Sequence, residues 1–155
     1  MSDVRLKMNF LSYLGKALKS DELLDLLETH DMEVIYDFDR SHENIPDQYW
    51  ATCLDLGLQL RFDDHQILRT IFLSLNQDDG NTPADLSNSD IPIFGSKQDV
   101  RNFASENNLK TTEGETEFFG AKHDWIRLEY SDHSIHYDFD GGPLKKVTIE
   151  KNEKE

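Results

Sequence analysis

Pairs of carboxylates two residues apart are the first feature of this sequence that could do chemistry. Asp37 with Asp39, and Asp138 with Asp140, each place two acids on one face of a strand. Such pairs could act as acid and base or bind Ca²⁺. The sequence lacks the calcium loop of alternating Asp residues that ends in Glu, and the Gly-Gly after Asp140 is typical of a hairpin turn. We therefore interpret both pairs as solvated acidic strand faces.

Histidine is the second residue type that invites a chemical reading, since the chain holds six. His133 and His136 would point to opposite faces of a strand, and no Cys pair or His-Glu-x-x-His motif completes a zinc site. His65 falls in a predicted turn, where a solvated histidine is usual. We expect no catalytic residue, no metal and no cofactor, although an enzyme with a site scattered over loops stays open.

The net charge of the chain indicates which class of partner it could bind. The 155 residues include 31 acidic and 16 basic side chains, a net charge of −15. Such a field repels nucleic acid and anionic membranes and attracts cationic proteins, although acidity can also serve solubility alone. The N-terminus lacks a signal-peptide pattern and no apolar run could span a membrane. The single cysteine, Cys53, suits a buried thiol, and we expect a cytoplasmic protein.

The first half of the chain predicts a helix followed by strands. Leucines after Ser20 recur at helical spacing and predict a helix over 21–30. Alternation predicts a half-buried strand over 33–39, and a hairpin follows, with its second strand over 67–75 in the sheet interior. The polar segment 76–92 predicts a long surface loop.

The second half repeats this order. Ser96 predicts a helix start, and a polar loop containing Gly114 is expected after the helix. Alternation over 125–130 and 135–139 predicts two strands, and Val147 with Ile149 closes the sheet.

Matched positions indicate that the halves are copies of one unit. Asp21 matches Asp99, Trp50 matches Trp125 and Asp63 matches Asp140, at offsets of 78, 75 and 77 residues. A repeated order of helix, Trp strand and hairpin is typical of duplication. The predicted fold is α+β, with tandem helix-plus-antiparallel-sheet units over 10–75 and 93–150, joined by the loop 76–92, in a single domain over 1–155. We expect the helices to pack on one side of the sheet.

The sequence resembles a large group of small bacterial immunity proteins found beside polymorphic and contact-dependent growth inhibition toxins. The resemblance lies in Leu14-Gly15-Lys16, the runs 57–62 and 68–73, Phe94-Gly95-Ser96 and the run 125–130. It implies a cytoplasmic inhibitor of one cognate toxin. It also implies no shared catalytic residues.

The hypothesis is therefore an immunity protein that neutralises a cognate toxin domain by blocking its active site or substrate groove. The expected toxin is a basic nuclease, because an acidic surface can occupy a groove that grips phosphate. The alternative is an acidic nucleic-acid mimic or scaffold that binds housekeeping DNA-binding proteins. We expect neither direct nucleic-acid nor membrane binding, and we favour a monomer.

Both Trp residues are expected in the core. The candidate partner-binding residues are Tyr36, Asp37, Asp39, Tyr49, Asp63, Asp64, Glu129, Asp138 and Asp140.

Overall fold

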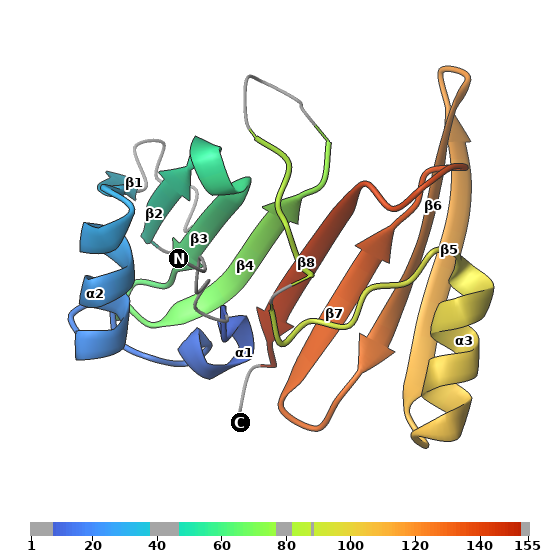
Figure 1. The fold of residues 1–155 in the computed structure, drawn as a ribbon, viewed down its shortest axis with the longest axis horizontal. Helices are drawn as coiled ribbons and strands as arrows, with labels where there is room; N and C mark the ends of the chain where they lie inside the picture. The colour runs from blue at the N-terminus through green and yellow to red at the C-terminus, as the bar shows by residue number, and fades with distance from the viewer. Residues whose placement is uncertain (1–7, 38–46, 77–81, 88, 153–155) are drawn as a thin grey trace, which may run out of the picture.

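The computed structural model describes residues 8–37, 47–76, 82–87 and 89–152. Within these ranges the chain is a mixed α+β fold that is mostly sheet (Figure 1). The α-helices are α1 (Phe10–Tyr13), α2 (Asp21–Thr29) and α3 (Lys97–Glu106), and a short 3₁₀ helix, η1, spans Leu54–Leu56. The strands are β1 (Glu33–Asp37), β2 (Gln48–Cys53), β3 (Leu58–Phe62), β4 (Leu68–Ser74), β5 (Lys110–Phe118), β6 (Ala121–Glu129), β7 (His133–Asp138) and β8 (Lys146–Lys151).

All eight described strands belong to one antiparallel sheet, in the order β1-β2-β3-β4-β8-β7-β6-β5. Each half of the chain contributes four sequential strands, and the last strand of each half lies at the middle of the sheet. There β4 pairs antiparallel with β8. After β4 the chain therefore runs to the far edge before it returns strand by strand, as Figure 1 shows.

The core is continuous across this central pairing. Leu60, Ile71, Ile149, Ile135 and Leu128 are successive register partners on five neighbouring strands, and each is 0% exposed. Residues in one register row share a face because side chains alternate along a strand. We call this buried side of the sheet the core face.

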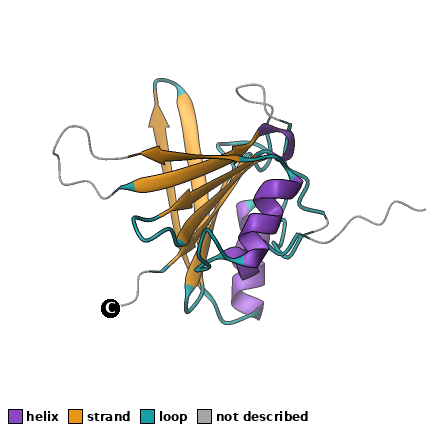
Figure 2. Cartoon of the chain, turned by 90° about the vertical axis from the view of Figure 1, so that its left-hand side faces the viewer, coloured by secondary structure: helices purple, strands orange, loops and turns teal. Residues whose placement is uncertain are grey.

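The longer helices begin where the sequence predicts. In α2, Asp21 and Glu22 occupy the first turn, where carboxylates favour the helix dipole. In α3 the Ser96 hydroxyl accepts a hydrogen bond from the Asp99 amide at 3.2 Å. Arg101 of α3 contacts Glu113, the register partner of Ile126, so α3 lies on the core face. Figure 2 shows the strands as one twisted layer with the longer helices beside it.

One segment differs from the prediction. The expected loop around Gly114 is the nine-residue strand β5. This strand lies at the sheet edge and reads Lys-Thr-Thr-Glu-Gly-Glu-Thr-Glu-Phe, so it lacks the apolar alternation of a half-buried strand. Charged side chains are common on edge strands, where they discourage pairing with other chains.

Gly57 fixes the turn into β3. It adopts φ +60°, and a Cβ there would come within 2.7 Å of the carbonyl oxygens of Ser74 and Thr82. Glycine alone meets both demands, because it tolerates a left-handed backbone and has no side chain. The turn thus packs against both the end of β4 and the segment 82–84.

Candidate functional site

The side of the sheet opposite the core face is the candidate functional surface, and we call it the outer face. Phe72, Thr148, His136 and Arg127 are successive register partners on β4, β8, β7 and β6. All four are half-buried, whereas their neighbours along the strands belong to the core. The row therefore runs across both halves of the molecule.

Two aromatic stacks stand on the outer face, one in each half. Trp50 stacks on Phe72 with ring centroids 6.1 Å apart. Trp125 stacks on His136 at 4.8 Å. The small residue Thr148 lies between Phe72 and His136 in the register row. The expectation that both Trp residues belong to the core is wrong: Ala51 and Ile126 take the core positions of their strands, so Trp50 and Trp125 point the other way.

A groove of about 420 Å³ opens where β4 and β8 meet at one end of the sheet. Its lining includes Phe72, Ser74, Asp138, Asp140, Lys145 and Lys146. The Lys146 ammonium lies 5.1 Å from the centroid of the Phe72 ring, a cation–π contact. Asp138 approaches His136 at 3.2 Å. The groove thus combines an aromatic floor with carboxylates that can accept hydrogen bonds from a cationic side chain.

Charges of both signs cross the outer face. Arg61 donates to the Thr70 hydroxyl at 2.9 and 3.1 Å. Arg127 pairs with Glu129 at 2.8 Å, and the Thr112 hydroxyl also donates to Glu129. The outer face therefore carries cations as well as carboxylates. A nucleic-acid mimic would need a continuous row of negative charges, and this face does not have one.

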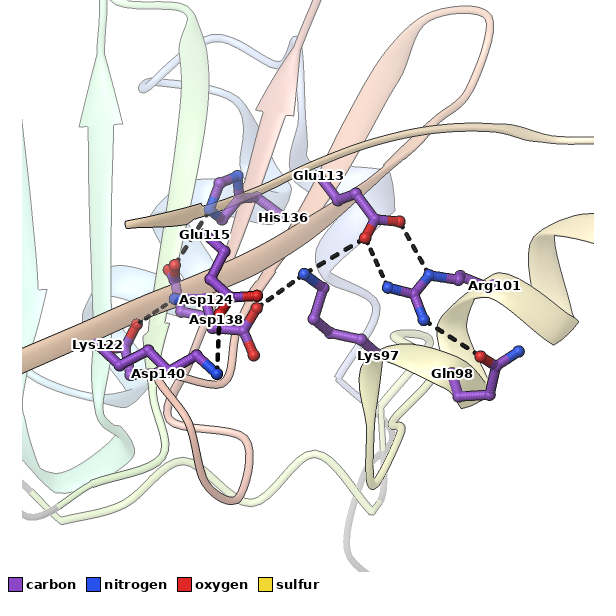
Figure 3. A network of polar contacts seen from close by, with 10 residues as sticks. All are labelled: Lys97, Gln98, Arg101, Glu113, Glu115, Lys122, Asp124, His136, Asp138 and Asp140. Atoms are coloured by element: carbon purple, nitrogen blue, oxygen red, sulfur yellow. Dashed lines mark hydrogen bonds and ion pairs between the residues drawn. The ribbon is translucent and has the colours of Figure 1, made fainter. Parts of the chain in front are cut away.

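A polar network fixes the groove end of β6 and β7 to α3 (Figure 3). Lys97 contacts Asp124 at 2.7 Å and Glu113 at 3.4 Å, and its side chain is 13% exposed. Arg101 donates two hydrogen bonds to Glu113 and, through this contact, lowers the pKa of Glu113 to about 2. The Asp124 amide donates to Asp140 at 3.2 Å, which links the network to the groove.

Two of the nine predicted partner-binding residues lie at the groove. Asp138 and Asp140 both line the groove. Asp140 adopts φ +52° in the turn after β7, as the sequence predicts for a hairpin turn there. Both are about a quarter exposed, at 26% and 23% of the side chain.

A second group lies at the β1 edge. Tyr36 and Tyr49 form a ring pair with centroids 4.9 Å apart. The Tyr36 hydroxyl donates to Asp47, and this hydrogen bond raises the pKa of Tyr36 to about 12. Asp37 is exposed on the same strand but points to the outer face, where its register partner is Gln48. Asp39 lies outside the described residues.

The remaining predicted residues lie at the end of the sheet away from the groove. Asp63 accepts hydrogen bonds from the amides of His65 and Ile67 and from Arg69 at 2.8 Å. Burial alone would raise the pKa of Asp63, but the hydrogen bonds from Ile67 and Arg69 outweigh it and hold the pKa below its usual value. Asp64 is exposed in the same turn, and Glu129 ends β6. The nine residues thus do not form one site.

The sequence did not predict that Phe72 and Lys146 line the groove. Phe72 lies in a strand with apolar residues on both sides, so the sequence marked the strand as interior without separating its faces. Lys146 stands in a short strand that the sequence identified only by Val147 and Ile149. The usable signal was the match of Trp50 with Trp125, because both residues lie on the outer face.

Comparisons with protein-family models, with curated proteins and with solved structures found no match to this chain. In the part of the chain that the structure describes, no helix is long and apolar enough to cross a membrane. Among the same residues, no group of three or more His, Cys, Asp and Glu side chains is placed to hold a metal ion.

Proposed function

We propose that this chain is an immunity protein that binds a cognate bacterial toxin domain and neutralises it. One observation carries the proposal: both Trp residues lie half-buried on the outer face, outside the core, in a protein with a net charge of −15. Tryptophan is enriched at interface positions that dominate binding energy. A half-buried aromatic surface within an acidic field suits a protein partner of opposite charge.

The contacts of Asp63 and Glu129 argue against a catalytic role for these two carboxylates. Asp63 is occupied by two backbone amides and Arg69, and Glu129 is occupied by Arg127 and Thr112. A general base needs a free approach to the proton that it abstracts. Groups held in this way are better suited to organising the sheet than to turnover.

The proposed partner is a basic domain, with a nuclease as the leading candidate. A nuclease carries cationic side chains where it binds phosphate, and these can stack on Trp50 and Trp125 or pair with Asp138 in the groove. Binding there would block the active site or the substrate groove. Long-range attraction would also speed association with an incoming toxin in the cytoplasm, where we place the protein as a monomer.

The second part of the proposal concerns the architecture. We propose that the two halves arose by duplication and that the helices cover the same face of the sheet. In its favour, each half has a helix followed by four antiparallel strands, and each Trp lies on the second strand of its half. Sequences of relatives, aligned half against half, would test it: an offset near 75 to 78 residues should persist, and its loss would contradict duplication.

The test of function is co-expression with the toxin domain encoded beside the gene. Cells that express both proteins should grow, and the two should co-purify. Asp138→Lys should weaken the complex about tenfold or more by placing a cation in the groove. Asp64→Lys is the matched control, because it changes net charge equally at the far end of the sheet.

Two results would contradict the proposal. Toxin that still kills cells, with no complex surviving purification, would reject the immunity function. Recovery of polymerase or nucleoid proteins in place of one toxin would favour the nucleic-acid mimic instead.

A further inference from the structure

The Phe72 ring in the groove already has a cation beside it. The ammonium of Lys146, an exposed residue of the neighbouring strand β8, lies 5.1 Å from the ring centroid. Trp50 stacks on the same ring, with centroids 6.1 Å apart, and limits its movement. An aromatic ring attracts a cation over its face because the π electrons there are negative. The groove therefore contains a formed position for a cationic group.

Lys146 occupies this position although a carboxylate lies directly across from it. Asp138 on β7 is the register partner of Lys146, and both residues line the groove. Opposite charges at directly opposed positions of two strands usually pair. In the described part of the chain these two side chains form no ion pair, and Asp138 contacts His136 at 3.2 Å instead (Figure 3). The cation–π contact of an exposed lysine is weak, so little is lost when Lys146 moves off the ring.

The carboxylates of the groove can accept further hydrogen bonds. Oδ1 of Asp138 contacts His136, and Oδ1 of Asp140 accepts a hydrogen bond from the Asp124 amide at 3.2 Å. Within the described residues, Oδ2 of neither carboxylate has a hydrogen-bond partner. An ionised carboxylate accepts through both oxygens. The groove thus offers two acceptors to an incoming donor.

Backbone hydrogen bonds fix the position of these groups. The Lys145 amide donates to the Asp138 carbonyl at 2.8 Å, and the Lys145 carbonyl accepts from the Leu75 amide at 2.8 Å. These bonds join the ends of β7 and β4 to the start of β8. Groups that are fixed before a partner arrives lose less entropy on binding. The groove, at about 420 Å³, is also large enough to hold one long side chain.

Arginine is the cationic side chain that suits this combination best. Its guanidinium is planar and weakly hydrated, so it can stack on a ring while its N–H groups donate to carboxylates. The ammonium of lysine is a compact, strongly hydrated charge that cannot stack. The net charge of −15 also favours the approach of a cation. The groove therefore favours arginine over lysine.

We propose that the groove binds an arginine side chain of the partner protein, and that its guanidinium replaces the Lys146 ammonium on the Phe72 ring and donates hydrogen bonds to Asp138 and Asp140. The inference rests on the proposed function, since the partner is the toxin domain. Lys146 is then a competitor within the chain itself. It covers the ring in the free protein and moves aside when the arginine enters.

The first test uses small probes in place of the toxin. Nα-acetyl-arginine amide is titrated into the isotope-labelled protein and followed by NMR. The matched probes are the citrulline derivative, which has nearly the same shape without the charge, and the lysine derivative. The arginine probe should shift the signals of the Phe72 ring and the Lys146 side chain, and should bind on the order of threefold more tightly than the lysine probe. The citrulline probe should not bind.

Variants test the role of Lys146. Lys146→Gln removes the competitor and should bind the arginine probe about threefold more tightly than the wild type. Phe72→Leu removes the π face and should bind it about threefold more weakly. Lys19→Gln is the matched control, because it makes the same change of charge at an exposed position in the turn before α2; its affinity should equal that of the wild type. The purified, inactivated toxin domain should give the same order of affinities.

The contrary outcomes are distinct. Unchanged or weaker binding of the arginine probe to Lys146→Gln would overturn the competition. Equal binding of the arginine and citrulline probes would overturn the cation site. Both results would leave the proposed function standing. Failure of the wild type to bind the toxin domain, while the arginine probe still enters the groove, would reject the proposed function and with it the toxin as the source of the arginine.

Discussion

Gly114 gives the Trp125 indole the space that it occupies on the outer face. A Cβ at position 114 would come within 2.7 Å of the indole, closer than side-chain atoms approach one another. Gly114→Ala should therefore displace Trp125, disrupt its stack on His136 and cost about 1–3 kcal/mol of unfolding free energy. Chemical unfolding followed by tryptophan fluorescence measures both effects.

Gly142→Ala is the control for this prediction. A Cβ at Gly142 meets nothing within 4 Å, so the substitution should leave stability unchanged or slightly raised. Equal stability of the two variants would show that the position of Trp125 does not depend on Gly114.

Glu113 gives a residue-scale prediction for acid pH. The hydrogen bonds from Arg101 lower the pKa of Glu113 from 4.5 to about 2. Because the folded-state pKa is depressed, the stabilisation is fully present above about pH 4.5 and is lost as the pH falls toward 2. The loss of unfolding free energy between pH 5 and pH 2 should thus be smaller in Glu113→Gln than in the wild type. If the unfolding free energy depended on pH in the same way in both proteins, the lowered pKa of Glu113 would be contradicted.

At the scale of elements, Lys97 joins α3 to the β5–β6 hairpin. Its ammonium contacts Asp124 at 2.7 Å, and both side chains are largely buried, at 13% and 15% exposure. Lys97→Met should leave Asp124 without this cation and cost about 2 kcal/mol of unfolding free energy. Thermal unfolding would measure this loss of stability. Lys122→Met, which removes a cation that is 43% exposed, should change the melting temperature much less; equal losses would contradict the role of burial.

Elements with strong periodic signals were predictable from the sequence. The helix expected over 21–30 is α2, Asp21–Thr29, and the interior strand expected over 67–75 is β4, Leu68–Ser74. In contrast, β5 was missed because its threonines and glutamates carry no apolar alternation, and its pairing with β6 specifies it instead. Local pattern thus identifies strands with apolar alternation, including the edge strand β1, better than the polar edge strand β5.

At the scale of the whole molecule, the two halves share one core through β4 and β8. The register partners Ile71 and Ile149 are each 0% exposed, one from each half. We predict a single unfolding transition in which Trp50 and Trp125 report the same midpoint. Single-tryptophan variants Trp50→Phe and Trp125→Phe, unfolded in urea, would measure this; two separate midpoints would contradict a shared core.

A substitution at the central pairing should act on both halves at once. Ile149→Ala removes buried apolar volume between them and should cost about 2–5 kcal/mol of unfolding free energy. Both fluorescence midpoints should shift together.

The candidate site was only partly predictable, because it depends on the order of strands. The sequence pointed to Asp138 and Asp140 through their spacing, and both line the groove. Phe72 and Lys146 join them only because β4 lies beside β8, a pairing of segments more than 70 residues apart that no local pattern encodes. The nine candidates spread over both ends of the sheet for the same reason.

The most direct test of the central claim is an NMR titration of the isotope-labelled protein with the inactivated toxin domain. We predict that amide shifts concentrate on the outer face, at Phe72, His136 and Thr148, and are small in α2 and α3. Shifts confined to α2 and α3, or no shifts at all, would contradict the account.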